Sequence, residues 1–317
     1  MKYYLAPLEG ITTYIYRNAY HKYFHKMDKY FTPFIVSHKE KRFNTRELKE
    51  LSPEHNQGLC VVPQIMSNDA EDFLKTASDM IQLGYTELNL NLGCPSKTVV
   101  SKGKGSGFLA FPDKLDSFLA QIFEKLDCEL SIKTRIGKSN PEEFHQLMEI
   151  YNKYPIKELI IHPRIQTDYY QNKPNWDMYA YATKHSNIPL CYNGDIHTKF
   201  DYDAFRKYFP ETEYIMCGRG IIANPGLVGL IEANEGLDKN TLSHFHNELL
   251  ESYIEISSGD RNVLFKMKEL WFYMGHLFVD ANKMMKKIKK VEKVVEYESI
   301  IETLFQNFEL RKECTSL

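Results

Sequence analysis

A lone cysteine lies where an alternating segment ends and a glycine- and lysine-rich segment begins, in ELNLNLGCPSKTVVSKGKGSG (87–107). Glycine and proline flank Cys94, and no apolar run surrounds it. Four other cysteines lie within or just before apolar runs, where cysteine acts as a small buried hydrophobe: Cys60, Cys128, Cys191 and Cys217. The sequence holds no Cys-x-x-Cys pair and no histidine at metal-ligand spacing, so we expect no zinc or iron–sulfur site. Cys94 is the thiol whose surroundings differ.

A lysine lies inside a segment otherwise suited to burial, LSIKTRIG (130–137). Lys133 shares its face with Ser131 and Arg135 if the segment is a strand. A buried ammonium group is costly unless an anion or hydrogen-bond acceptors meet it. The partner is either a bound ligand or a core carboxylate such as Glu87, and the polar residues at other strand ends favour the ligand.

Two glycine-containing tripeptides follow the last two strand-like segments, NGD (193–195) and GRG (218–220). Glycine lets backbone N–H groups approach an anion, a following helix adds its dipole, and Arg219 offers a charged fork. Either tripeptide alone is a routine turn. Both together, after the two strands where barrels commonly bind phosphate, predict a phosphate site.

Amide side chains lie on one face of the alternating segment, with Leu88, Leu90 and Leu92 on the other. If the leucines pack against outer helices, Asn89 and Asn91 point inward, where buried amides need partners. A heterocycle rimmed with carbonyl and N–H groups, or another polar side chain, would supply them. Gln64 ends a neighbouring segment, and an ordinary strand-end amide explains it equally well.

A histidine and an arginine two residues apart share a face in ELIIHPR (158–164). His162 alone would more often be a satisfied core histidine. With Arg164 beside it, the pair suggests donors aimed at one anionic or carbonyl-rich ligand.

Eight short apolar, β-branched or aromatic segments recur over the first three quarters of the chain and predict strands. They are YYLAPL (3–8), YFTPFIVS (30–37), CVVPQIM (60–66), TELNLNLG (86–93), LSIKTRIG (130–137), ELIIHPR (158–164), IPLCYNGD (188–195) and EYIMCGRG (213–220). Segments with helix-start patterns lie between most of them, as in SNDAEDFLKTASDMIQLG (67–84). Eight strand–helix units predict a (β/α)8 TIM barrel, whose chemistry lies at the carboxyl ends of the strands. A doubly wound sheet is the weaker alternative, because no G-x-G-x-x-G follows the first strand.

The last part of the chain predicts amphipathic helices with no strand between them. They are 241–258, 261–278, 280–295 and 298–310. We therefore expect a barrel domain over 1–238 and a small C-terminal all-helical domain over 239–317.

Charge and hydropathy limit the class of protein and its partners. The net charge is −2, but the segments 38–49 and 283–293 are basic, which leaves a polyanionic partner open. The apolar fraction is 43%, and no stretch has the length of a membrane span. The N-terminus is not typical of a signal peptide. We expect a cytoplasmic protein that contacts no membrane and binds no metal.

These residues resemble the tRNA-dihydrouridine synthase family over essentially the whole chain. The resemblance rests on LAPLEG (5–10), PQIM (63–66), ELNLNLGCPSKTV (87–99) with GKGSG (103–107), IKTRIG (132–137), IIHPR (160–164), YNGDI (192–196) and MCGRG (216–220). The run from Gly93 to Lys97 with its glycine-rich continuation is the most specific part. One departure is Leu8, where the family usually has methionine of similar volume.

The resemblance implies an FMN-dependent oxidoreductase, re-reduced by NADPH, that reduces the C5–C6 double bond of particular uridines in tRNA. It implies that Cys94 donates a proton to C5. It assigns the cofactor to Pro7, Leu8, Glu9, Gln64, Lys133, His162, Asn193, Gly194, Asp195, Gly218 and Arg219. It assigns the substrate to Asn91, Arg164 and Lys97, although His162 and Arg164 could each lie near either the phosphate or the substrate.

The family's substrate implies further features of this chain. The target base must leave its stack, so we expect the loop after Cys94 to be mobile and to close over it. The helical domain, the basic segments and the loop lysines are expected to contact tRNA phosphates. The enzyme is expected to be a monomer, and GCPSKTV leans towards the D-loop without fixing a position.

Two alternatives remain at this level. Another FMN-dependent barrel acting on a small pyrimidine or enone would share Lys133 and the phosphate loops but would not need a basic helical domain. A non-catalytic RNA-binding protein on the same barrel would have no reason to keep Cys94 and a costly buried lysine.

Overall fold

The computed structural model describes residues 1–37 and 43–311, so residues 38–42 of the predicted basic segment lie outside it. The chain forms two compact units, which are described one at a time. The first unit comprises Met1–Pro7, Asp28–Gly194 and Phe209–Met216. The second comprises Leu8–Met27, Asp195–Tyr208 and Cys217–Leu317.

The strands of the first unit fall in the eight predicted segments. They are β1 (Lys2–Leu5), β2 (Lys29–Phe31), β3 (Ile35–Val36), β4 (Val61–Val62), β5 (Gln64–Met66), β6 (Glu87–Leu92), β7 (Glu129–Arg135), β8 (Leu159–His162), β9 (Leu190–Tyr192) and β10 (Tyr214–Cys217). Ten strands arise from eight segments because two segments are each interrupted at a proline, Pro33 and Pro63. Proline has no N–H for the ladder, so a strand breaks or bends there.

The sheet closes on itself. Its order is β3-β5-β6-β7-β8-β9-β10-β1-β2-β4. The two ends of this order are halves of neighbouring segments, because β2 pairs with β4 and β3 pairs with β5, both in parallel. The segment that holds β2 and β3 therefore pairs along its length with the segment that holds β4 and β5. This pairing joins the two ends of the order, so the sheet is a closed barrel of eight parallel segments. The predicted TIM barrel is confirmed.

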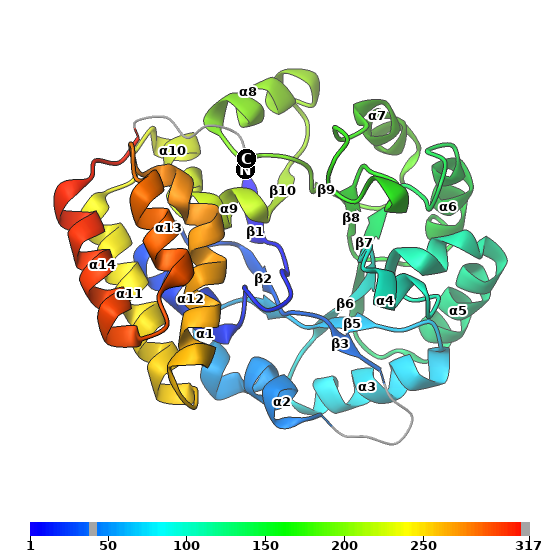
Figure 1. Ribbon diagram of the computed structural model, residues 1–317. Helices are drawn as coiled ribbons and strands as arrows, with labels where there is room; N and C mark the ends of the chain where they lie inside the picture. The colour runs from blue at the N-terminus through cyan, green and yellow to red at the C-terminus, as the bar shows by residue number, and fades with distance from the viewer. Residues whose placement is uncertain (38–42, 312–317) are drawn as a thin grey trace. The chain divides into compact units, whose positions relative to one another are not determined.

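Helices surround this sheet. Those of the first unit are α2 (Thr45–Leu51), η1 (Pro53–Asn56), α3 (Ala70–Gln82), α4 (Lys97–Val100), η2 (Gly105–Ala110), α5 (Pro112–Lys125), α6 (Glu143–Tyr151), η3 (Gln166–Asp168) and α7 (Trp176–His185). Figure 1 shows α3, α5, α6 and α7 on the outside of β5 to β9. Asp69 caps α3 by accepting a hydrogen bond from the backbone of Asp72, as expected of an acidic helix start. Phe73, Ala77 and Met80 of α3 are buried at helical spacing.

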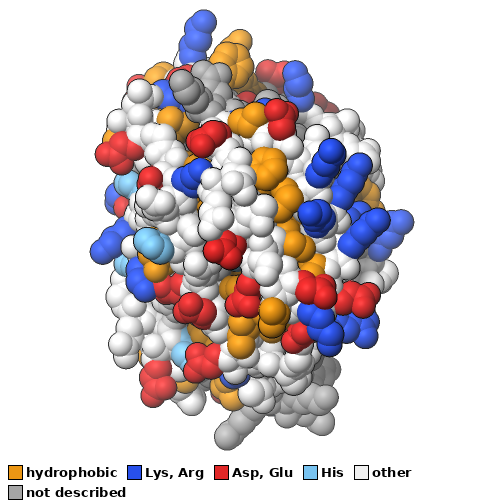
Figure 2. Space-filling view, turned by 60° about the vertical axis from the view of Figure 1, so that its left-hand side comes forward, with side chains coloured by type: hydrophobic (Ala, Val, Ile, Leu, Met, Phe, Trp, Pro, Cys, Tyr) orange, Lys and Arg blue, Asp and Glu red, His pale blue; other side chains and the backbone are white. Residues whose placement is uncertain are grey.

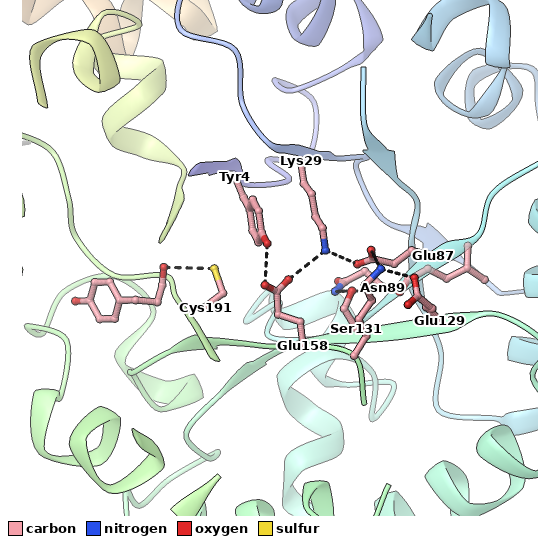
Figure 3. A network of polar contacts seen from close by, with 11 residues as sticks. Tyr4, Lys29, Glu87, Asn89, Glu129, Ser131, Glu158 and Cys191 are labelled. Carbon is pink, nitrogen blue, oxygen red and sulfur yellow. Dashed lines mark hydrogen bonds and ion pairs between the residues drawn. The ribbon is translucent and has the colours of Figure 1, made fainter. Parts of the chain in front are cut away.

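An ion-pair network joins several strands near their amino ends (Figure 3). Lys29 contacts Glu87 at 2.9 Å and Glu158 at 3.4 Å. The hydroxyl of Tyr4 donates to Glu158 at 2.8 Å, and Lys157 contacts the other oxygen of Glu87 at 2.9 Å. The sequence analysis did not predict this network, which crosslinks four segments at the end of the barrel where barrel residues serve stability.

The second unit is helical. Its helices are α1 (Tyr14–Tyr23), α8 (Lys199–Tyr208), α9 (Arg219–Ala223), α10 (Leu227–Ala233), α11 (Lys239–Ile256), α12 (Asp260–Met274), η4 (Gly275–Leu277), α13 (Asn282–Lys290) and α14 (Val294–Asn307). Helices α11 to α14 lie side by side (Figure 1). The predicted domain boundary falls at Asp238, which caps α11, whereas the compact unit also includes earlier segments. That boundary stays a prediction.

A buried histidine organises the core of these helices. The ring nitrogen Nε2 of His246 lies 2.6 Å from the hydroxyl of Tyr297, which also accepts a hydrogen bond from Trp271 at 2.6 Å. Burial lowers the pKa of His246 to about 4, so the ring is neutral at pH 7. No helix within residues 1–37 and 43–311 is long and apolar enough to cross a membrane.

Helix α13 presents lysines to solvent. Met284 and Ile288 are its buried residues. The exposed positions include Lys286, Lys287, Lys289 and Lys290. Figure 2 brings forward the side that carries α11 to α14, and lysine and arginine side chains gather along one flank of that face beside hydrophobic ones.

Candidate functional site

Three buried amides from two strands bind one another in the barrel interior. The amide nitrogen of Gln64 donates to Asn89 at 2.8 Å, and that of Asn91 donates to the Gln64 oxygen at 2.7 Å. The Asn89 nitrogen continues the chain to the hydroxyl of Ser131 at 2.9 Å. The inward face predicted for Asn89 and Asn91 is confirmed. The sequence left open whether a bound heterocycle or other polar side chains are the partners of these amides. The structure shows polar side chains as partners.

Asn91 also shapes the turn that carries Cys94. Its side-chain oxygen accepts hydrogen bonds from the backbone N–H groups of Gly93 and Cys94, both at 3.0 Å. An asparagine that bonds the backbone two and three residues on forms a local turn at the end of a strand. The family resemblance assigned Asn91 to the substrate. In the structure, its side-chain oxygen contacts the backbone of this turn.

The glycine-rich segment after Cys94 is folded back onto this turn rather than extended from it. Its residues Gly105 to Leu109 are buried within η2. A side chain on Gly105 would come within 2.8 Å of the Cys94 carbonyl oxygen, and one on Gly107 within 2.8 Å of the Val100 oxygen. These glycines allow close backbone packing here, and the expected closing motion of the loop stays a prediction. Lys97 is exposed on α4.

Lys133 lies opposite Asn91 on the adjacent strand β7. Its ammonium group makes no hydrogen bond or ion pair with any residue that the structure describes. Burial, reinforced by the positive charge of Arg135, lowers its pKa to about 8, while the Cys94 and Cys191 thiols act in the opposite direction. The alternative partner Glu87 is excluded, because Glu87 pairs with Lys29 and Lys157.

His162 and Arg164 contact each other at the end of β8. An Arg164 nitrogen lies 3.0 Å from Nε2 of His162, and another donates to the Asn172 carbonyl at 2.5 Å. Because arginine can only donate, Nε2 of His162 must be the acceptor, which places the ring proton on Nδ1. The two side chains thus form a donor–acceptor pair with each other, and the prediction that both donate to one anionic or carbonyl-rich ligand stays a prediction. His162 also stacks on Tyr170, with 5.9 Å between ring centres.

Arg135 joins the Gly93–Cys94 turn to the loop after β8. The sequence analysis did not assign it to the site. The side chain is fully buried and donates to the carbonyl oxygens of Gly93 at 3.0 Å, Ile165 at 2.9 Å and Tyr169 at 2.7 Å. Its position on the face of Lys133 was visible in the sequence, but its three carbonyl partners lie in segments far away along the chain.

The residues predicted to hold a phosphate fall in both units. In the first, the Asn193 amide donates to the Met216 carbonyl at 2.8 Å, and a side chain on Gly194 would overlap the Tyr192 hydroxyl at 1.9 Å. In the second, Arg219 pairs with Asp195 at 2.6 Å. Gly218 immediately precedes α9. The phosphate role of these residues stays a prediction.

The segment after β1 divides between the units as well, with Pro7 in the first and Leu8 and Glu9 in the second. The Leu8 N–H donates to the Thr12 hydroxyl at 2.8 Å, and Glu9 is exposed. The flavin contacts predicted for these three residues remain predictions.

The closed parallel sheet places the protein among the (β/α)8 barrels. A solved structure with a similar fold is a variant of NCR from Zymomonas mobilis, with a TM-score of 0.50 and 14% identity, covering 77% of this chain and 90% of that one. At this identity the likeness concerns the fold alone.

The family follows from the sequence match. The model of the family described as dihydrouridine synthase (Dus) matches residues 4–314, and the chain belongs to that family. Relatives include tRNA-dihydrouridine synthase B of Pasteurella multocida, 26% identical over 77% of this chain and 73% of that protein. Another is named "Probable tRNA-dihydrouridine synthase 2" in Bacillus subtilis, 26% identical over 78% of this chain and 74% of that protein. The predicted family is confirmed, and with it the class of enzyme, an oxidoreductase.

Proposed function

We propose that this chain is a tRNA-dihydrouridine synthase that reduces the C5–C6 double bond of uridines in tRNA with bound FMN, using NADPH as the electron donor. The names of its relatives support tRNA as the substrate. FMN and NADPH rest on the family resemblance and on the fit of the residues that follow.

The observation that carries the cofactor proposal is Lys133. The half-buried ammonium group has no partner among the described residues, and its pKa is lowered to about 8, so it favours an anionic or carbonyl-rich ligand. The N1–C2 edge of a flavin supplies that chemistry, since negative charge collects there in the reduced form. Gln64, on β5 and so separated from β7 by β6, would hydrogen-bond the polar edge of the ring.

The other cofactor residues keep the roles that the resemblance assigns. Pro7, Leu8 and Glu9 line the ring. Asn193, Gly194, Asp195, Gly218 and Arg219 hold the ribityl chain and phosphate, with His162 near them. The ion pair with Asp195 supports this proposal, because it orients the Arg219 side chain at the start of α9.

When bound and reduced, FMN supplies a hydride for C6 of the uracil. The chain must then deliver a proton to C5, where negative charge collects. Cys94 donates it: the S–H bond breaks, a C5–H bond forms, and the resulting thiolate regains a proton from water. An ordinary thiol has a pKa of about 8.5 and so holds its proton at neutral pH.

The substrate residues hold the uracil and the surrounding tRNA. Asn91 and Arg164 face the base, and Lys97 contacts the phosphates beside it. The exposed lysines of α13 add phosphate contacts that hold the tRNA without reading its sequence.

The experiment that tests this function uses the protein purified without added cofactor. It is reduced anaerobically with NADPH, mixed with tRNA that lacks dihydrouridine, and followed at the visible flavin band. Fast reoxidation by this tRNA, but not by tRNA already carrying dihydrouridine, is the expected result. A colourless protein refutes the flavin, and a reduced flavin that ignores both tRNAs refutes the substrate.

A further inference from the structure

Every backbone polar group of the Gly93–Cys94 turn has a hydrogen-bond partner. The two N–H groups are bound by Asn91. The Gly93 carbonyl accepts from Arg135 at 3.0 Å. The Cys94 carbonyl accepts from the hydroxyl of Ser106 at 2.8 Å and from its N–H at 3.1 Å. Both peptide units around the thiol are therefore held in fixed orientations.

Ser106 reaches Cys94 because two glycines remove the obstacles on either side. Gly105 has a φ of +55°, which favours glycine, and a Cβ there would also lie 3.2 Å from Cβ of Cys94. Gly107 packs equally closely against the backbone of Val100. The glycine-rich segment thus delivers one hydroxyl to the carbonyl next to the thiol.

Arg135 holds the other side of the turn and connects it to the loop after β8. Two other N–H groups of its guanidinium bind the carbonyls of Ile165 and Tyr169. The guanidinium also lies 5.3 Å from the ring centre of Tyr170. A planar group with donors in three directions is needed for this, and lysine cannot replace it.

We infer that Arg135 and Ser106 are positioning residues that fix the direction of the Cys94 thiol, by holding the carbonyl groups on both sides of its peptide unit. The inference rests on the proposed function, in which Cys94 gives a proton to C5. A proton donor must lie within hydrogen-bond reach of the accepting atom, so a loosened turn slows the transfer without weakening tRNA or flavin binding.

Ser106→Ala is the mild test, because the N–H bond to Cys94 remains. We expect kcat for dihydrouridine formation to fall about fivefold, the effect of one lost hydrogen bond. The KM for tRNA and the rate of flavin reduction by NADPH should stay within twofold of the unmodified enzyme. Arg135→Lys keeps the charge but loses the fork, and kcat should fall at least 100-fold.

A second readout does not depend on turnover. Iodoacetamide alkylation of Cys94 in the holoenzyme is followed by mass spectrometry of its peptide, with the exposed Cys60 as the internal reference. A less restrained thiol should react about fivefold faster in Ser106→Ala, while Cys60 is unchanged. Unchanged kcat and unchanged Cys94 alkylation would overturn the inference.

The matched control is Ser186→Ala. Ser186 follows α7, and its hydroxyl donates to the carbonyl of Ile188 at 2.8 Å, so the same kind of bond is removed in a loop that does not contact the cysteine turn. This variant should leave kcat and Cys94 alkylation within twofold, and an effect as large as that of Ser106→Ala would overturn the positioning role. If Cys94→Ala keeps full activity, the proton-donor assignment fails, while the alkylation rates still decide whether the turn is positioned.

Discussion

Lys133 should destabilise the protein in which it lies whenever no flavin is bound. Its pKa is lowered from 10.5 to about 8, mainly by burial. Between these two values the unfolded chain binds a proton that the folded chain does not, so the free energy of unfolding rises with pH. Replacing the residue by methionine, as in Lys133→Met, removes this dependence and leaves an apolar side chain of similar length.

The expected size follows from the two pKa values. Between pH 7 and pH 9.5 the integrated proton difference corresponds to about 2 kcal/mol of unfolding free energy. Because Lys133 is only partly shielded from solvent, this figure is an upper limit. At pH 7 the methionine variant of the apoprotein should therefore be more stable than the natural chain.

The assay is urea unfolding of the flavin-free protein at both pH values, for the natural chain, Lys133→Met and the control Lys125→Met. Lys125 is an exposed residue at the end of α5. The natural chain and the control should gain stability at high pH relative to Lys133→Met by the same amount. For each chain, the free energy of unfolding at pH 7 is subtracted from that at pH 9.5. The greater hydrophobicity of methionine contributes equally at both pH values and cancels in this difference. Added FMN should stabilise the natural chain and the control but not Lys133→Met.

One result would refute the reasoning. If Lys133→Met shows the same change in stability between pH 7 and pH 9.5 as the natural chain, the ammonium group is not desolvated. The partnerless lysine would then carry no information about a ligand.

Three further outcomes are expected. Cys94→Ala should keep its bound flavin and NADPH reduction but lose most dihydrouridine formation, measured by nucleoside mass spectrometry; full activity contradicts the proton-donor role. Neutralising the four exposed α13 lysines together should weaken tRNA binding and flatten its dependence on salt, and an unchanged salt slope would move the RNA contact elsewhere. The lysines are Lys286, Lys287, Lys289 and Lys290. The pKa of His246 is lowered to about 4, so unfolding free energy should fall by up to about 3 kcal/mol as the pH drops from 6.5 to 4. In His246→Phe, the free energy of unfolding measured by urea should no longer fall over this pH range. If it falls as much as in the natural chain, other groups cause the decline.

The order of strands and the inward face of β6 were predictable from the sequence. Alternation along a strand has a period of two, so Leu88, Leu90 and Leu92 determine the direction of Asn89 and Asn91 without any knowledge of the neighbours. The prediction of eight strands differs from the ten observed only in counting, because each extra strand begins after a proline inside a predicted segment. Motifs at the strand ends were sufficient to identify the family.

The glycine-rich segment shows where sequence reasoning is weakest. The expected loop motion came from the substrate, whose base must leave its stack, and the composition of the segment gave no account of what its glycines contact. In the structure, Gly105 and Gly107 serve close packing. Composition cannot predict this use of glycine, because it depends on what the backbone meets.

Local patterns thus determined the type and direction of each element and marked Cys94, Lys133 and the glycine tripeptides as unusual. The tertiary structure decided the partners. Glu87 pairs with Lys29 and Lys157 instead of Lys133, and Arg135 binds the carbonyl of Gly93, 42 residues away. Side-chain direction follows from the backbone geometry of a few consecutive residues, whereas a hydrogen bond between distant segments depends on how the closed barrel brings their ends together.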